Sequence, residues 1–131
     1  MSPRVLVVDD DPQIRQLLVR VLELENLETV IAPNGLEGWQ RLQEAPVDLV
    51  ISDLVMPELD GLELARRVRE RYGRAVKFIL FSSLGDVQGP IADDAGIDTC
   101  LPKPVAVREL IRVIRDALGR PPPSETDGHH M

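Results

Sequence analysis

Short apolar runs of strand length alternate along this chain with longer stretches that have the spacing of an amphipathic helix. The apolar runs are residues 4–8, 28–32, 47–52, 78–81 and 99–101. Helical spacing is present between them, as at Ile14, Leu17 and Leu18 in the first stretch. Such an alternation predicts an α/β fold, in which a parallel sheet is covered by helices on both faces.

Several helix boundaries can be predicted from local signals. Asp11 is a suitable N-cap for the first helix, and Pro12 suits its first turn because the N–H that proline lacks would be unpaired there. Further helices are expected after residues 33–35, after 60–61 and over 107–118. The helix expected within 86–95 is the weak one. Gly89-Pro90 would interrupt it, so we expect a short or displaced helix that starts near Pro90.

Five strands that are each followed by a helix predict a (βα)5 doubly wound sheet in one domain. The chain has 131 residues, which is long enough to bury a proper core. We expect the domain to occupy residues 1–119. Residues 120–131 have no apolar pattern and begin with a run of prolines, which predicts a flexible tail or the remnant of a linker.

Composition argues against several classes of protein. No apolar run is long enough to span a membrane, and Met1 to Arg4 lead directly into a strand without a secretory signal. The net charge of −7 argues against direct nucleic-acid binding, which needs clustered Lys and Arg. Cys100 is the single cysteine, so an intrachain disulfide is excluded and a reducing cytoplasm is the expected location.

Polar residues directly follow four of the five apolar runs, and the carboxyl ends of parallel strands share one edge of a sheet. These residues are Asp9, Asp10 and Asp11, Asp53, Ser82 and Ser83, and Lys103. Two carboxylates about 4 Å apart repel by roughly 4 kcal/mol at an effective dielectric near 20, so a cluster of them calls for a cation. Oxygen ligands suit a hard ion, and Mg²⁺ accepts one or two carboxylates together with waters and phosphate oxygens.

Asp53 is the strongest candidate for a reactive group, because a charge at the end of a central apolar run is costly unless something uses it. A carboxylate can attack phosphorus and form an acyl phosphate. Lys103 and Ser82 could then supply an ammonium and a hydroxyl to the phosphoryl oxygens. Plainer interpretations are a helix cap for Asp11, a solvated loop acid for Asp9, a turn serine for Ser82 and a surface lysine for Lys103.

At these residues the chain resembles the receiver domain of two-component response regulators. The matching segments are residues 7–10, residues 51–53 with 56–57 and 60–61, residues 81–83, and residues 101–104. The resemblance covers about residues 4–118, and the joint occurrence of these segments is highly specific. It implies a flavodoxin-like fold with the strand order 2-1-3-4-5.

The resemblance also implies roles for the acidic residues. Asp53 would be the phospho-acceptor, and Asp10 and Asp53 would be ligands of Mg²⁺. Asp9 would bind the ion through water, and Val55 would offer its backbone carbonyl.

Ser82 and Lys103 resemble the pair that binds the phosphoryl group in this family. The family pattern makes the Lys103-Pro104 bond cis, whereas composition alone predicts trans, since only ~5–6% of X-Pro bonds are cis in folded proteins. The phosphoryl donor would be a phosphohistidine on a sensor histidine kinase or a histidine phosphotransfer protein. The chain would catalyse its own phosphorylation and dephosphorylation and turn over no separate metabolite, so we do not expect an enzyme in the usual sense.

Three features depart from the family pattern. Cys100 stands where an aromatic residue or histidine commonly turns inward after phosphorylation. Gly89-Pro90 falls in a helix that normally forms part of the output surface. Val55 and Leu84 are apolar at the positions that help align the hydrolytic water, which predicts a long-lived phosphoryl group.

Two other functions are alternatives to a phosphorylated receiver. An aspartyl-phosphate hydrolase would need its nucleophile among residues 9–11 and a cap region for substrate, and no stretch is long enough for a cap. A receiver that is never phosphorylated and acts as a scaffold is the second alternative. Family members also commonly dimerise through the surface of the fourth helix, fifth strand and last helix, so a homodimer is a further expectation.

Overall fold

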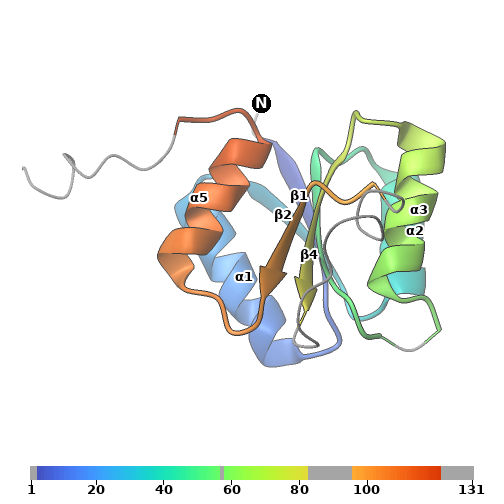
Figure 1. The fold of residues 1–131 in the computed structure, drawn as a ribbon, viewed down its shortest axis with the longest axis horizontal. Coiled ribbons are helices and arrows are strands. Elements are labelled where there is room, and N and C mark those ends of the chain that lie inside the picture. The colour runs from blue at the N-terminus through green and yellow to red at the C-terminus, as the bar shows by residue number, and fades with distance from the viewer. Residues whose placement is uncertain (1–2, 57, 83–95, 122–131) are drawn as a thin grey trace, which may run out of the picture.

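The computed structural model describes residues 3–56, 58–82 and 96–121, which form one sheet with helices on both sides (Figure 1). The strands are β1 (Arg4–Val8), β2 (Glu28–Ala32), β3 (Leu49–Asp53), β4 (Lys77–Ser82) and β5 (Thr99–Pro102). The helices are α1 (Pro12–Leu24), α2 (Gly35–Glu44), α3 (Gly61–Tyr72) and α5 (Val107–Ala117). The expected weak helix at 86–95 lies outside the described residues.

The strands are all parallel and lie in the order β2-β1-β3-β4-β5. This confirms the predicted flavodoxin-like α/β fold and its strand order. β1 and β3 are neighbours in the middle of the sheet, although α1, β2 and α2 separate them in the chain. The central position of β3 agrees with its sequence, since all five of its residues are buried.

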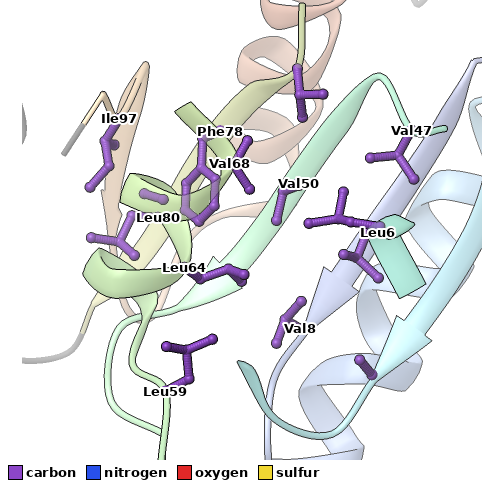
Figure 2. Close-up of a cluster of buried hydrophobic side chains, with 14 of the residues drawn as sticks. Leu6, Val8, Val47, Val50, Leu59, Leu64, Val68, Phe78, Leu80 and Ile97 are labelled. Atoms are coloured by element: carbon purple, nitrogen blue, oxygen red, sulfur yellow. The ribbon is translucent and has the colours of Figure 1, made fainter. Parts of the chain in front are cut away.

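Each face of the sheet carries its own hydrophobic core. On one face, Leu6, Val50 and Phe78 pack against α2 and α3 (Figure 2). On the other, Ile51 and Ile79 pack against α1 and α5. Adjacent residues of a strand point to opposite faces, so an apolar run that faces helices on both sides fills both cores.

The start of α1 has the predicted cap. The side chain of Asp11 accepts a hydrogen bond of 2.9 Å from the backbone N–H of Gln13, and Pro12 occupies the first helical position. Asn34 and Asp60 cap α2 and α3 in the same way. These caps satisfy backbone N–H groups that a helix start leaves without partners.

Two of the polar residues that were predicted to follow strands lie within the strands. Asp53 and Ser82 are the last residues of β3 and β4, not the first residues after them. Among the described helices none is long and apolar enough to cross a membrane.

Candidate functional site

The predicted site residues all lie at the carboxyl end of the sheet. Asp9 directly follows β1, Asp53 ends β3, Ser82 ends β4, and Lys103 directly follows β5. These four strands are consecutive neighbours in the sheet. The topology therefore brings together residues that lie far apart in the chain, as expected for a ligand site on a parallel sheet.

The three aspartates predicted as metal ligands form a compact cluster. Asp9, Asp10 and Asp53 each offer a carboxylate oxygen, and these oxygens lie within 4.8 Å of one another. Asp9 and Asp53 are buried, with 1% and 9% of their surfaces exposed, and Asp10 is open to solvent. The cluster therefore has two carboxylates that water solvates poorly and one that it reaches freely.

Asp9 is held at both of its carboxylate oxygens. Its Oδ1 accepts a hydrogen bond of 2.9 Å from the backbone N–H of Asp11, and its Oδ2 lies 3.3 Å from the Nζ of Lys103. Burial raises the pKa of the Asp9 carboxyl, against the opposing effects of the Asp11 N–H and the charge of Lys103. The solvated loop acid that was one interpretation of Asp9 is therefore wrong.

Lys103 contacts both buried carboxylates. Its Nζ lies 3.2 Å from the Oδ1 of Asp53 and 3.3 Å from the Oδ2 of Asp9. Burial acts to lower the pKa of the Lys103 ammonium, but the charges of Asp9 and Asp53 outweigh it and the pKa is raised. Lys103 is thus an inward-facing, protonated lysine and not a solvated surface residue.

The backbone around Lys103 is fixed by the neighbouring strand. The N–H of Lys103 donates a hydrogen bond of 2.9 Å to the carbonyl of Ser82, and the peptide bond between Lys103 and Pro104 is cis. The composition-based prediction of a trans bond is therefore wrong, and the one implied by the family resemblance is confirmed.

A glycine that belongs to the matching segment around Asp53, but for which no role was predicted from the sequence, lies directly behind Asp53. A Cβ on Gly61, the first residue of α3, would lie 2.4 Å from the carbonyl oxygen of Asp53. The N–H of Gly61 donates to the carbonyl of Leu54 at 2.9 Å. The Oγ of Ser52 donates to the Asp53 carbonyl at 2.8 Å. The backbone of Asp53 is thus packed against the start of α3 at a distance that only glycine permits.

Arg15 is a second residue that the sequence analysis missed. Its Nη1 donates a hydrogen bond of 2.6 Å to the backbone carbonyl of Asp9. Because Arg15 lies one turn into α1, it ties the start of that helix to the end of β1. The signal in the sequence was its spacing, since a residue in the first turns of a helix capped by Asp11 can reach back to the loop before it.

Other predicted residues have less defined places. Val55 lies in the loop after β3 and is 55% exposed. The role of its carbonyl as a metal ligand stays a prediction. Cys100 lies in β5 opposite Leu80 of β4 and packs against the core beneath α2 and α3. Leu84 and Gly89-Pro90 lie outside the described residues.

Comparison with known proteins agrees with this geometry. The family model of the response regulator receiver domain matches residues 5–115. The chain belongs to this family. Receiver domains are signalling modules of two-component systems, and response regulators interact with sensor kinases.

Several relatives of this receiver domain are similar over most of its length. "Response regulator MprA" of Mycobacterium sp. (strain KMS) is 36% identical over 126 residues, which are 95% of this chain and 54% of the relative. The "Transcriptional regulatory protein CpxR homolog" of Haemophilus influenzae is 38% identical over 118 residues, 89% of this chain and 51% of the relative. The chain spans about half the length of the curated relatives it matches.

The fold of this receiver domain is also found in solved structures. A CheY-like response regulator receiver domain protein from Methanospirillum hungatei superimposes with a TM-score of 0.85 at 28% identity, covering 91% of this chain and 95% of that chain. A response regulator from Chloroflexus aurantiacus gives a TM-score of 0.83 at 30% identity, covering 92% and 100%.

The acidic cluster of this receiver domain fits a divalent cation. Three carboxylates converge and Lys103 supplies one positive charge among them, so negative charge remains in excess. The donors are oxygens, which suits a hard ion, and the exposed Asp10 leaves the cluster open to water on one side. The site can thus hold a metal ion through Asp9, Asp10 and Asp53.

Proposed function

We propose that this chain is a phospho-accepting receiver, in which Asp53 takes a phosphoryl group from a phosphohistidine of a sensor histidine kinase or a histidine phosphotransfer protein. The main support for this proposal is the position of Lys103. Its ammonium contacts the two buried carboxylates at 3.2 and 3.3 Å, and because it supplies only one positive charge, the cluster keeps an excess of negative charge. A buried cluster of this kind is unfavourable unless a cation or a reaction uses it.

The proposed transfer uses Asp53 as the nucleophile. A carboxylate oxygen of Asp53 attacks phosphorus, the bond between phosphorus and the donor imidazole breaks, and the product is an acyl phosphate with the histidine as leaving group. Lys103 would bind a phosphoryl oxygen, and the hydroxyl of Ser82, at the end of β4, would donate to another. Mg²⁺ bound by Asp9, Asp10, Asp53 and the Val55 carbonyl would supply positive charge to the transferring oxygens.

Phosphorylation would also act as a switch. The Nζ of Lys103 has a carboxylate of Asp53 as its partner before transfer, and a phosphoryl oxygen afterwards. The backbone N–H of Lys103 donates to the carbonyl of Ser82, so a movement of the Lys103 side chain would be transmitted to the ends of β4 and β5. A group that interacts with one of two arrangements of these segments shifts the population toward it.

We assign the receiver to residues 1–119 and the remainder, 120–131, to a tail or linker. The contacts at the end of α5 support a domain that extends at least to Gly119. Arg115 pairs with Glu25 at 2.6 Å, and the N–H of Arg120 donates to the Arg115 carbonyl at 2.8 Å, so the chain is still tied to the domain just past Gly119. A cytoplasmic location is part of the same proposal.

Phosphorylation by acetyl phosphate with Mg²⁺ tests the proposal. The wild-type chain should gain an acid-labile phosphate and Asp53→Asn should gain none. Asp11→Asn is the matched control, because Asn is an equally good N-cap, and it should be phosphorylated like the wild type. Unchanged labelling of Asp53→Asn would favour the hydrolase alternative, with its nucleophile at residues 9–11. Absence of labelling in the wild type would favour the scaffold.

A further inference from the structure

β2 is the outer strand of the described sheet, and one of its edges has no neighbouring strand. It pairs with β1 on one side, and in the described residues no strand lies on the other. An open edge of this kind exposes backbone donors and acceptors that can pair with another strand. Natural proteins commonly block such an edge with charged side chains, above all lysine, with proline or with a bulge. Residues 28–32 contain neither lysine nor proline, and their one charged residue, Glu28, stands at the start of the strand.

The hydrogen bonds to β1 identify which backbone groups face outward. The N–H of Glu28 donates to the carbonyl of Pro3, and the carbonyl of Ala32 accepts from Asp9. Alternate residues of a strand direct their backbone groups to the same side, so Glu28 and Ala32 face β1. Thr29 and Ile31 therefore direct their N–H and carbonyl groups to the open edge.

The helices on both faces leave β2 partly uncovered. On the face of α1, a depression of about 540 Å³ lies along the helix and reaches Ile31, whose side chain is 45% exposed. On the face of α2, a second depression of about 520 Å³ is lined in part by Val30 and Val47. The edge thus combines unpaired backbone groups with accessible apolar side chains.

We propose that β2 is the interface of a symmetric dimer, in which the open edges of two copies pair antiparallel around a two-fold axis at Val30. Thr29 of one copy then lies opposite Ile31 of the second copy. Because both residues direct their backbone groups outward, each such pair can exchange both of its N–H···O bonds. The same five residues supply both halves of the interface, which is the self-complementarity that a two-fold dimer requires.

The charges along α1 favour a second copy over an unrelated strand. Arg15, Arg20 and Glu23 all line the depression beside Ile31. Arg15 lies near the end of β2, whereas Glu23 also lines a neighbouring depression beside Thr29, near the start of β2. A two-fold axis at Val30 exchanges the two ends, so Glu23 of one copy is directed toward Arg15 of the second copy. Val19, which lies between them on α1, is directed toward its own counterpart.

The oligomeric state of the full chain in solution tests this dimer. Sedimentation velocity over a range of micromolar to millimolar concentration should show a reversible dimer with a dissociation constant of about 10 μM to 1 mM, because the interface is small. Hydrogen exchange at the two ends of that range should show the amides of Thr29 and Ile31 becoming protected as the dimer forms.

Two variants change the edge without touching the bonds to β1. Thr29→Pro removes an outward N–H, and proline is tolerated where an edge N–H faces solvent. Ile31→Lys places a charge on the same edge. Leu24→Lys is the matched control, because Leu24 is also exposed and apolar but lines none of the three depressions. Both edge variants should weaken dimerisation at least about tenfold, and the control should not.

The proposal is contradicted if the wild type is monomeric at the highest concentration. It is also contradicted if the dimer persists in both edge variants, which would place the interface elsewhere, or if the amides of Thr29 and Ile31 exchange equally fast in monomer and dimer. None of these outcomes depends on phosphorylation of Asp53, so this inference and the proposed function can fail independently.

Discussion

The Nζ of Lys103 lies 3.2 Å from the Oδ1 of Asp53, although Lys103 directly follows β5 and Asp53 ends β3, and these two strands are not adjacent. The same ammonium contacts Asp9 at 3.3 Å. One positive charge therefore stabilises two buried negative ones in the resting protein. The stability of the fold should therefore depend on the charges of Lys103, Asp9 and Asp53.

Replacing Lys103 by methionine should lower stability and make it depend on Mg²⁺. Without the ammonium, Asp9 and Asp53 repel each other with poor solvation, and the free energy of unfolding should fall by about 1–3 kcal/mol. Added Mg²⁺ should recover a larger part of the stability in the variant than in the wild type. Urea unfolding with and without Mg²⁺ measures both effects.

Lys77 provides the control for that experiment. It is the chain's other lysine and begins β4, at the opposite end of the sheet. Mg²⁺ should raise the free energy of unfolding of Lys77→Met by no more than it raises that of the wild type. A similar dependence on Mg²⁺ in both variants would show that the effect does not arise at the Asp9–Asp53 pair.

Replacing Gly61 by alanine should disturb Asp53 through its backbone. The new Cβ would lie 2.4 Å from the Asp53 carbonyl oxygen and 2.6 Å from the Cδ1 of Leu80, so the start of α3 must move. We expect a loss of about 3 kcal/mol in the free energy of unfolding and slower phosphorylation by acetyl phosphate.

Gly119→Ala is the comparison for Gly61→Ala. Gly119 has a φ of 70°, which disfavours alanine, but among the described residues other than its chain neighbours no atom lies within 4 Å of its would-be Cβ. The free energy of unfolding of Gly119→Ala should fall by about 1 kcal/mol, and the variant should be phosphorylated at the rate of the wild type. Equal phosphorylation rates for the two variants would show that the close packing at Gly61 does not position Asp53.

Most of the fold could be predicted from the alternation of apolar runs and helical spacing. The strand order came from the family resemblance, because periodicity alone does not say which strands are neighbours. The ends of the strands were predicted less accurately. Asp53 and Ser82 are polar, so the pattern placed them after the strands, whereas β3 and β4 extend through them. The backbone pairing of Asp53 with Phe81 of the adjacent strand decides that boundary, and a single sequence does not contain it.

The members of the site could be predicted, but not what holds them in place. Asp9, Asp53 and Lys103 were visible as polar residues at strand ends. The hydrogen bond from Arg15 to the Asp9 carbonyl and the close approach of Gly61 to Asp53 depend on how helices are seated on the sheet. Such contacts between elements leave no periodic signal.

Arg15→Ala should weaken metal binding without touching a proposed ligand. Arg15 holds the carbonyl of Asp9 at 2.6 Å, and its removal frees the loop that carries Asp9 and Asp10. Residues that orient metal ligands typically contribute 10–100-fold to affinity, and we expect the dissociation constant for Mg²⁺ to rise about tenfold by calorimetry. Arg20→Ala, on the same helix, should leave it unchanged. Equal affinities of the two variants for Mg²⁺ would show that Arg15 does not support the metal site.

Val55→Asn should shorten the lifetime of the phosphorylated protein. Val55 is exposed two residues after Asp53, and an amide there can hydrogen-bond a water that attacks phosphorus, which valine cannot. Decay after removal of acetyl phosphate should be about tenfold faster than in the wild type, with Leu24→Asn as an exposed control that decays like the wild type. Decay of the wild type as fast as that of Val55→Asn would contradict the predicted long-lived phosphoryl group.

Direct mapping of the phosphorylated residue is the sharpest test of Asp53 as the phospho-acceptor. Reduction of an acyl phosphate with borohydride converts the phosphorylated aspartate to homoserine, which peptide mass spectrometry locates. After treatment with acetyl phosphate and Mg²⁺, we predict homoserine at position 53 and unmodified aspartate at positions 9 and 10. Homoserine at position 9 or 10, with Asp53 unmodified, would contradict this prediction.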